Sequence, residues 1–203
     1  NRSIICMTAG TPTTTANMFG VAKGSAIDSL VFENVEFTGY CDNKSSATKI
    51  GYLFNNKTPC KISALKMLNC KIHNLGNTPF RLSGNTGTAD STSQRISNLI
   101  INGCIISEMG FSSGYGIVNI SKSSDYIDNV SILNSTIYNF SYPLISIVQT
   151  AATAMNSVLI QNCTFNQSTQ NSSSTRALVT LDFINVTNGI RVKNCIFGSS
   201  GTM

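Results

Sequence analysis

The chain has 203 residues and a formal net charge of +5, but only 11% of its residues are charged, against about 25% in ordinary globular proteins. Asn, Ser and Thr fill 71 of the 203 positions, while hydrophobic residues make up 41%, which is too apolar for a disordered chain. No run of 18 apolar residues and no cluster of Lys and Arg occurs, so we expect no membrane span and no nucleic-acid interface.

Six segments of eleven residues share one pattern and align without gaps. The fourth and sixth positions of each segment are apolar, and this alternation is typical of a half-buried β-strand. The eleventh position is always Phe or Ile. A repeat of this length without helical periodicity predicts stacked coils that bury a continuous interior. In chain order the segments are residues 27–37, 62–72, 96–106, 127–137, 155–165 and 187–197.

Two columns of the repeat indicate a bend in every coil. The eighth position holds residues that tolerate positive φ, and stacked Asn side chains there can form a ladder of hydrogen bonds. The ninth position is small and is expected to point inward after the bend. The eighth column is Asn34, Asn69, Gly103, Asn134, Asn162 and Asn194, and the ninth is Val35, Cys70, Cys104, Ser135, Cys163 and Cys195.

A second apolar stretch lies between successive repeats, at residues 50–54, 80–82, 117–120, 144–148 and 178–183. Polar loops such as 84–95 and 167–175 follow several of these stretches. The sequence therefore predicts an all-β chain with one domain over residues 1–203, a single-stranded parallel β-helix (β-solenoid) of about six coils. Crossovers between parallel strands are right-handed by default. Regular coils should span residues 27–197, after an irregular N-terminal coil or cap at 1–26.

The repeated pattern I-[DSN]-x-L-x-I-x-N-C-x-F resembles the right-handed parallel β-helix of the pectate-lyase-like superfamily. More narrowly, it is similar to secreted β-helix domains of uncharacterised function in Bacteroidetes, often found alongside polysaccharide-utilisation systems. The resemblance covers residues 27–203, and N-C-x-F is its most specific part. It implies a secreted or cell-surface location and, as partner, a pectin-like polysaccharide or the surface glycan machinery. Such families contain lyases, hydrolases and members without known activity, so the site must decide the chemistry.

The seven cysteines show no spacing typical of a zinc site. Four of them share the ninth column, where parallel stacking does not aim their Cβ atoms at one another as a disulfide requires. We expect buried free thiols in this column. Cys41 and Cys60 lie outside it, and both a disulfide between them and two free thiols remain open.

Two groups of charged residues have structural interpretations. The second column consists of residue types that cap backbone turns, so its two aspartates are assigned to turns. Glu36 and Lys71 share the tenth column on neighbouring coils and should form an exposed ion pair of little energetic value. The second column is Asp28, Ser63, Ser97, Asp128, Asn156 and Asn188.

A strip of polar residues directly follows the eleventh column. Its members His73, Glu108, Tyr138 and Asn139 are the candidate carbohydrate-binding residues, because an aromatic face with hydroxyl and amide groups suits a sugar. The alternative interpretation is a second stack of solvated turns without function.

A catalytic version would use Glu108 as general acid or base with His73 beside it. Glycoside hydrolysis normally needs two carboxyl groups, and Glu108 has no acidic partner in nearby columns. Asp42, Asp90, Asp125 and Asp182 are scattered, and no set of calcium ligands can be assembled. We therefore predict no catalytic residue, cofactor or metal.

The leading hypothesis is a non-catalytic, secreted or cell-surface domain that binds or presents polysaccharide. The alternatives are a polysaccharide lyase or glycoside hydrolase, with loop aspartates in its site, and a structural or adhesin module. Because solenoids need protected ends, we also expect more chain or a partner at one or both ends.

Overall fold

The computed structural model describes residues 2–6, 17–39, 50–56, 59–82, 95–109, 117–120, 125–140, 145–147, 154–167 and 185–199. These residues form twenty β-strands and no helix, and every strand pairing among them is parallel. The described part of the chain therefore contains no helix that could cross a membrane.

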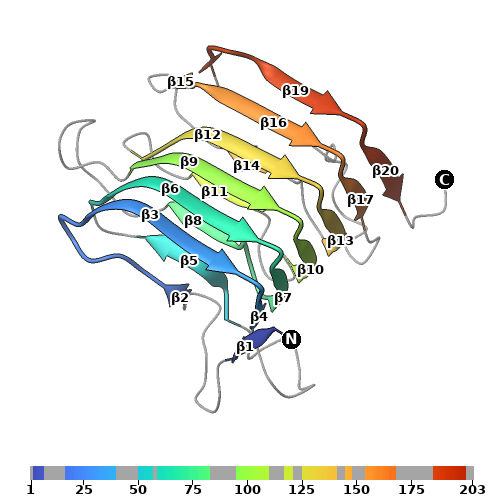
Figure 1. The fold of residues 1–203 in the computed structure, drawn as a ribbon, viewed down its shortest axis with the longest axis horizontal. Coiled ribbons are helices and arrows are strands. Elements are labelled where there is room, and N and C mark those ends of the chain that lie inside the picture. Colours follow the sequence, from blue (N-terminus) through green and yellow to red (C-terminus); the bar gives the residue numbers. More distant parts are fainter. Residues whose placement is uncertain are drawn as a thin grey trace.

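The strands form three long sheets and one short one (Figure 1). Sheet A contains β1 (Ser3–Cys6), β4 (Val35–Thr38), β7 (Lys71–Leu75), β10 (Ile105–Met109), β13 (Thr136–Phe140), β17 (Thr164–Gln167) and β20 (Ile196–Ser199). Sheet B contains β2 (Asn17–Phe19), β5 (Tyr52–Asn56), β8 (Phe80–Leu82), β11 (Val118–Ile120) and β14 (Ile145–Ile147). Sheet C contains β3 (Ala26–Glu33), β6 (Lys61–Leu68), β9 (Arg95–Asn102), β12 (Tyr126–Leu133), β16 (Ser157–Gln161) and β19 (Ile190–Lys193). The short sheet pairs β15 (Ala154–Met155) with β18 (Asn185–Val186).

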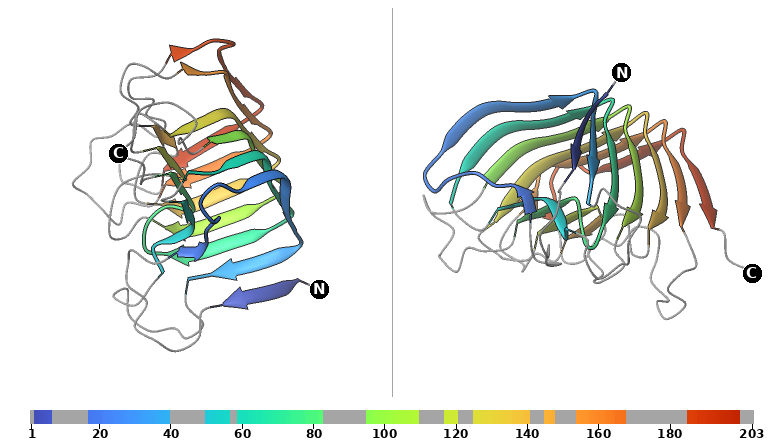
Figure 2. Two further views of the ribbon diagram at one scale, coloured as in Figure 1. Left: turned by 90° about the vertical axis from the view of Figure 1, so that its left-hand side faces the viewer. Right: turned by 90° about the horizontal axis from the view of Figure 1, so that it is seen from below.

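The chain visits sheets B, C and A in turn, so the predicted parallel β-solenoid is confirmed (Figure 2). Sheet C has one strand from each of the six repeats. Its four inner strands each pair on both sides, whereas β3 and β19 are the end strands among those described. Within the predicted N-terminal cap, β1 and β2 join sheets A and B by regular parallel pairing. The predicted stretch at 178–183 lies outside the described residues.

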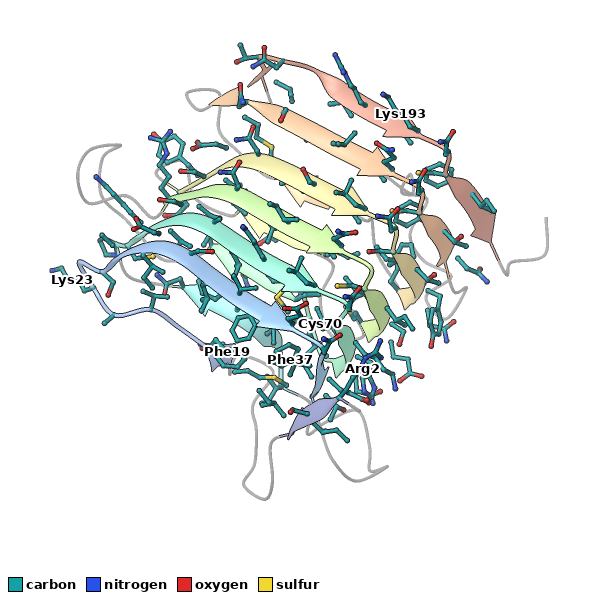
Figure 3. The ribbon with its side chains drawn as sticks, viewed as in Figure 1. Arg2, Phe19, Lys23, Phe37, Cys70 and Lys193 are labelled. Atoms are coloured by element: carbon teal, nitrogen blue, oxygen red, sulfur yellow. The ribbon has the colours of Figure 1, made fainter. Side chains whose placement is uncertain are left out.

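The core consists of inward-facing side chains that stack from coil to coil. At the fourth position of the repeat, Leu65 and Leu99 are paired across β6 and β9 and both are buried. Burial of one such side chain contributes about 1.5–3 kcal/mol. In the first coil, Phe19 contacts Phe32 and Phe37, with ring centroids 4.9 Å and 5.7 Å apart (Figure 3).

The predicted bend column is confirmed. Each of its six residues has a φ between 48° and 67°, in the left-handed region. Asn162 Nδ2 donates to Asn134 Oδ1 at 3.0 Å, and Asn194 Nδ2 donates to Asn162 Oδ1 at 3.3 Å. Asn134 Nδ2 donates to Asn102 Oδ1 at 2.8 Å. Asn102 thus takes the place of Gly103, which has no side chain, and the ladder continues through the amide of the preceding residue.

The interpretation of the second column as turn caps is wrong for the first four coils, where the residues lie inside strands β3, β6, β9 and β12. These strands begin earlier than the apolar alternation suggests. Lys61, Arg95 and Tyr126, which precede the alternation, are already strand partners across neighbouring coils. Asp128 instead forms an ion pair, with its Oδ2 accepting from Arg95 Nε at 2.8 Å. Only in the last two coils do Asn156 and Asn188 precede their strands.

Candidate functional site

A row of polar side chains crosses sheet A just after the buried eleventh column. We call it the polar row, and its members are in register from β4 to β17. Adjacent strands lie about 4.8 Å apart, so His73 and Tyr138 are two strand spacings apart with Ser107 between them. The row is Thr38, His73, Ser107, Tyr138 and Asn166.

The residue after the polar row forms a second bend. Asn74, Glu108 and Asn139 have φ values of 59°, 56° and 52°. Among the described residues with positive φ, Glu108 alone is neither Asn nor Gly. Such a conformation costs an ordinary side chain about 1–2 kcal/mol. The four candidate residues are therefore divided, with His73 and Tyr138 in the polar row and the other two in a turn stack.

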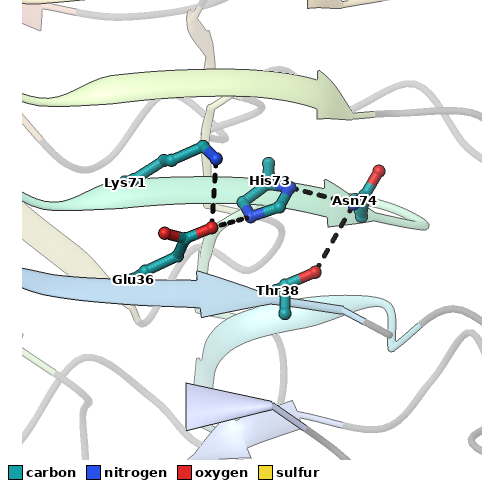
Figure 4. A network of polar contacts seen from close by, with 5 residues as sticks. All are labelled: Glu36, Thr38, Lys71, His73 and Asn74. Atoms are coloured by element: carbon teal, nitrogen blue, oxygen red, sulfur yellow. Dashed lines mark hydrogen bonds and ion pairs between the residues drawn. The ribbon is translucent and has the colours of Figure 1, made fainter. Parts of the chain in front are cut away.

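A network of polar contacts surrounds His73 (Figure 4). Glu36 Oε1 accepts a hydrogen bond from Lys71 Nζ at 3.0 Å and lies 2.9 Å from His73 Nε2. Asn74 Nδ2 lies 2.9 Å from His73 Nδ1 and donates to Thr38 Oγ1 at 3.4 Å. With the amide nitrogen donating to Nδ1, the ring proton is on Nε2 and is donated to the Glu36 carboxylate.

This network contains the ion pair that the aligned repeats predict and a second contact that they do not predict. The predicted ion pair between Glu36 and Lys71 is present, but it is half-buried and not exposed as expected. His73 also contacts Glu36, although it is in register with Thr38 and not with Glu36. Glu36 and His73 are diagonal neighbours on one sheet face, an arrangement within reach of long side chains. A search of diagonal as well as aligned positions could have found the pair.

The electrostatic environment of Glu36 favours its charged form. Partial burial acts to raise the pKa of this carboxyl, but the hydrogen bonds from Lys71 and His73 and the nearby positive charge of Lys71 outweigh it. The pKa of Glu36 is therefore lowered from its usual value. The carboxylate stays ionised near neutral pH and holds both basic side chains in place.

The geometry gives little support to two-carboxyl chemistry. Glu36 and Glu108 lie two coils apart and three columns apart, so their Cα atoms are about 14 Å from each other by strand spacing and rise. The Glu36 carboxylate is also engaged by Lys71 and His73, whereas glycosidases use a pair of carboxyls that flank the scissile bond. Within the described residues, no three His, Cys, Asp or Glu side chains are grouped as metal ligands would be. Asp42, Asp90 and Asp182 lie outside that part of the chain.

Exposure differs along the candidate residues. Ser107 and Thr38 are buried, and the His73 side chain is 15% exposed. Tyr138 and Glu108 are half-buried, whereas Asn139 and Asn166 are exposed. The accessible part of the polar row is thus the edge of the His73 network, the Tyr138 ring and the Asn166 amide.

The thiols of the ninth column have a structural role. Cys163 Sγ donates to the carbonyl oxygens of Ile132 and Gln161, at 3.4 Å and 3.2 Å, and the other thiols of the column make equivalent contacts. Ser135 makes the same bond through Oγ to Leu133 O at 2.6 Å. In the part of the chain that the structure describes, the cysteines found free are Cys60, Cys70, Cys104, Cys163 and Cys195.

The acid–base properties of these thiols do not suggest a nucleophile. Burial raises the pKa of Cys163 and raises that of Cys60 to about 11. A hydrogen bond with Cys104 lowers the pKa of Cys70 and raises that of Cys104, but both side chains are buried. The thiol of Cys60 is free and accepts a hydrogen bond from Asn56. Its possible partner Cys41 lies outside the described residues.

Sequence reasoning missed a second polar row, on sheet B. Asn55, Arg81 and Asn119 are in register, and both asparagines are buried. Arg81 Nη1 donates to Tyr52 Oη, and its guanidinium lies 5.3 Å from the centre of the Tyr52 ring. The available signal was a polar residue between two apolar ones at Arg81 and Asn119, although Asn55 is followed by another asparagine.

No family model, no curated protein and no solved structure matches this chain. The parallel β-solenoid is therefore established by the geometry of the described strands alone.

Proposed function

We propose that this chain is a non-catalytic domain that binds or presents polysaccharide along the polar row of sheet A. The observation that carries the proposal is the in-register alignment of the accessible imidazole, phenol and amide groups of His73, Tyr138 and Asn166, with the buried Ser107 between the first two. Sugars offer both hydroxyl groups and apolar CH faces, which match polar side chains and an aromatic ring. Sheet strands hold these groups at fixed spacing, so little ordering is needed on binding.

The repeat motif supports a location and a first ligand. Its likeness to secreted Bacteroidetes β-helix domains favours a secreted or cell-surface protein. The same likeness makes pectin-like polysaccharides the first ligands to test. Within the network, the positive charge of Lys71 is paired with the negative charge of Glu36.

A glycan array with matched tyrosine variants tests the proposal. Tyr138→Ala should weaken binding at least tenfold, because removal of a central aromatic anchor is commonly among the costliest changes at an interface. Tyr126→Ala is the control, since Tyr126 is also half-buried but lies on sheet C. A folded wild-type protein that binds no plant or host glycan would contradict the proposal.

A polysaccharide lyase or glycoside hydrolase is the second candidate, and the conformation of Glu108 favours it. Residues in strained backbone conformations are concentrated at active sites. Release of new sugar ends from a polysaccharide, abolished by Glu108→Gln, would establish an enzyme in place of a binding domain. A folded chain that neither binds nor cleaves glycans would support the structural or adhesin alternative.

A further inference from the structure

The part of the polar row on β10, β13 and β17 carries a negative charge. In these three strands, Glu108 is the only Lys, Arg, His, Asp or Glu residue. The ion pairs among the described residues involve the carboxylates of Glu36 and Asp128, and Glu108 takes part in none of them. Residues 110–116 and 141–153, which follow β10 and β13 in the sequence, contain no charged residue either. No described basic side chain therefore neutralises Glu108.

Glu108 lies beside Tyr138, on the neighbouring strand of sheet A. Its own neighbours Ser107 and Met109 are in register with Tyr138 and Phe140. The Cα atoms of Glu108 and Tyr138 are therefore about 6 Å apart, from one strand spacing and one residue of rise. Both residues are half-buried. A charge on a ligand that packs on the Tyr138 ring would lie within about one Debye length of the carboxylate, where screening by salt is incomplete.

The backbone conformation of Glu108 is unfavourable for a glutamate. Its φ is 56°, and the residues at the same place on the neighbouring coils, Asn74 and Asn139, have φ values of 59° and 52°. Asparagine tolerates this left-handed conformation better than glutamate does. Residues held in such conformations are concentrated at functional sites. A carboxylate at a position where both neighbouring coils have an amide therefore indicates a role for its charge.

The accessible groups of the polar row define the direction of a ligand. His73, Tyr138 and Asn166 lie on strands β7, β13 and β17, which follow one another along the solenoid axis, with β10 between the first two (Figure 1). Three strand spacings, about 14 Å, separate His73 from Asn166. A ligand that contacts all three side chains is longer than one sugar ring and runs across the strands. Its middle part then lies over Tyr138, next to Glu108.

We propose that the polar row selects uncharged polysaccharide chains laid along the solenoid axis, and that Glu108 is the residue that excludes anionic ones. This inference rests on the proposed function. A carboxylate or sulfate group on the sugar beside Tyr138 would face the Glu108 carboxylate, and like charges so placed repel. The hydroxyl groups and CH faces of an uncharged sugar meet no such repulsion, so the carboxylate acts through discrimination between ligands. For a pectin-like polymer, the bound stretch is methyl-esterified.

Homogalacturonan oligosaccharides of equal length, in methyl-esterified and de-esterified forms, give a pair of probes that differ in charge. In calorimetric titrations at low salt, wild type should bind the esterified form about fivefold more tightly, because the other form brings like charges together. Glu108→Gln should remove most of this preference, and Glu108→Lys should reverse it. The preference of wild type should also shrink in about 1 M salt, where the Debye length is about 3 Å.

Glu33→Gln is the matched control, because Glu33 is exposed and lies on β3 of sheet C. It should keep the wild-type preference. On a glycan array, the glycans whose binding depends on Tyr138 should likewise be uncharged.

Two results would overturn the inference and leave the proposed function intact. One is Tyr138-dependent binding of anionic glycans as tight as that of their uncharged counterparts. The other is a preference that Glu108→Gln and Glu108→Lys both leave unchanged while each variant is folded by circular dichroism. A folded wild-type protein that binds no glycan contradicts the proposed function and this inference together.

Discussion

In five of the six repeats, an asparagine in the eighth column forms the bend at which the chain turns. At Asn134 the backbone is left-handed and the amide both donates to Asn102 and accepts from Asn162. Glycine at this position would adopt the left-handed conformation readily but would lose the hydrogen bonds of the ladder. Alanine would lose the same hydrogen bonds and would also be strained in the left-handed conformation. The two substitutions therefore separate the conformational contribution from the hydrogen-bonding one.

We predict that Asn134→Ala destabilises the fold more than Asn134→Gly does. Both lose two amide hydrogen bonds, and alanine also occupies the left-handed region at a cost of about 1 kcal/mol. Urea unfolding measures the difference, which should be about 1 kcal/mol in favour of glycine. Equal losses, or a larger loss with glycine, would show that the bend imposes no conformational demand.

A second residue-scale prediction concerns acid stability. The folded pKa of Glu36 lies below its ordinary value of 4.5, so the contacts stabilise the fold above that pH and are lost as pH falls through the folded pKa. Stability should decline more steeply for wild type than for Glu36→Gln between about pH 5 and pH 3. Unfolding midpoints in urea at stepped pH give the comparison. Parallel profiles would contradict the assignment.

At the scale of the element, neighbouring coils repeat the same hydrogen bonds at the same positions. The ninth column shows this well, because Cys163 and Ser135 both donate to the backbone carbonyl oxygen two residues earlier, at the bend. In the five coils after Val35 the column holds a small side chain with a donor, and redox chemistry is not needed to explain the cysteines.

Substitutions at Cys163 test that explanation. We predict that Cys163→Ser changes the unfolding free energy by less than about 1.5 kcal/mol, as volume-conserving changes do when the new hydroxyl keeps a partner. Cys163→Leu should cost more, about 1–3 kcal/mol or above, because the site is fully enclosed. Chemical denaturation measures both values. A larger loss with serine than with leucine would show that the thiol itself is required.

Much of this architecture could be predicted because a solenoid repeats its physical demands at fixed columns. The strands of sheet C, the bends at Asn69 or Asn194 and the pair of Glu36 with Lys71 all follow from aligned positions. The contact of His73 with Glu36 could not be predicted in the same way, because it runs diagonally between columns. The polar row of sheet B was missed because loops of varying length separate its short strands.

At the scale of the whole molecule, parallel stacking explains the unusual composition. Every described strand pairing places like columns side by side about 4.8 Å apart, where like charges repel. Asn, Ser and Thr can occupy such columns and hydrogen-bond along them, as the ladders at the bends show. The same stacking holds the polar row of sheet A as a regularly spaced set of groups, which is the basis of the proposed function.

Nuclear magnetic resonance titration with an array-selected glycan tests the central claim most directly. The largest amide shift changes should fall on β10, β13 and β17, at Ser107, Tyr138 and Asn166 and the residues beside them. Sheet C should change little, and Tyr138→Ala should abolish the changes at the same glycan concentration. Shift changes concentrated on sheet B or sheet C, or unaffected by Tyr138→Ala, would contradict binding at the polar row.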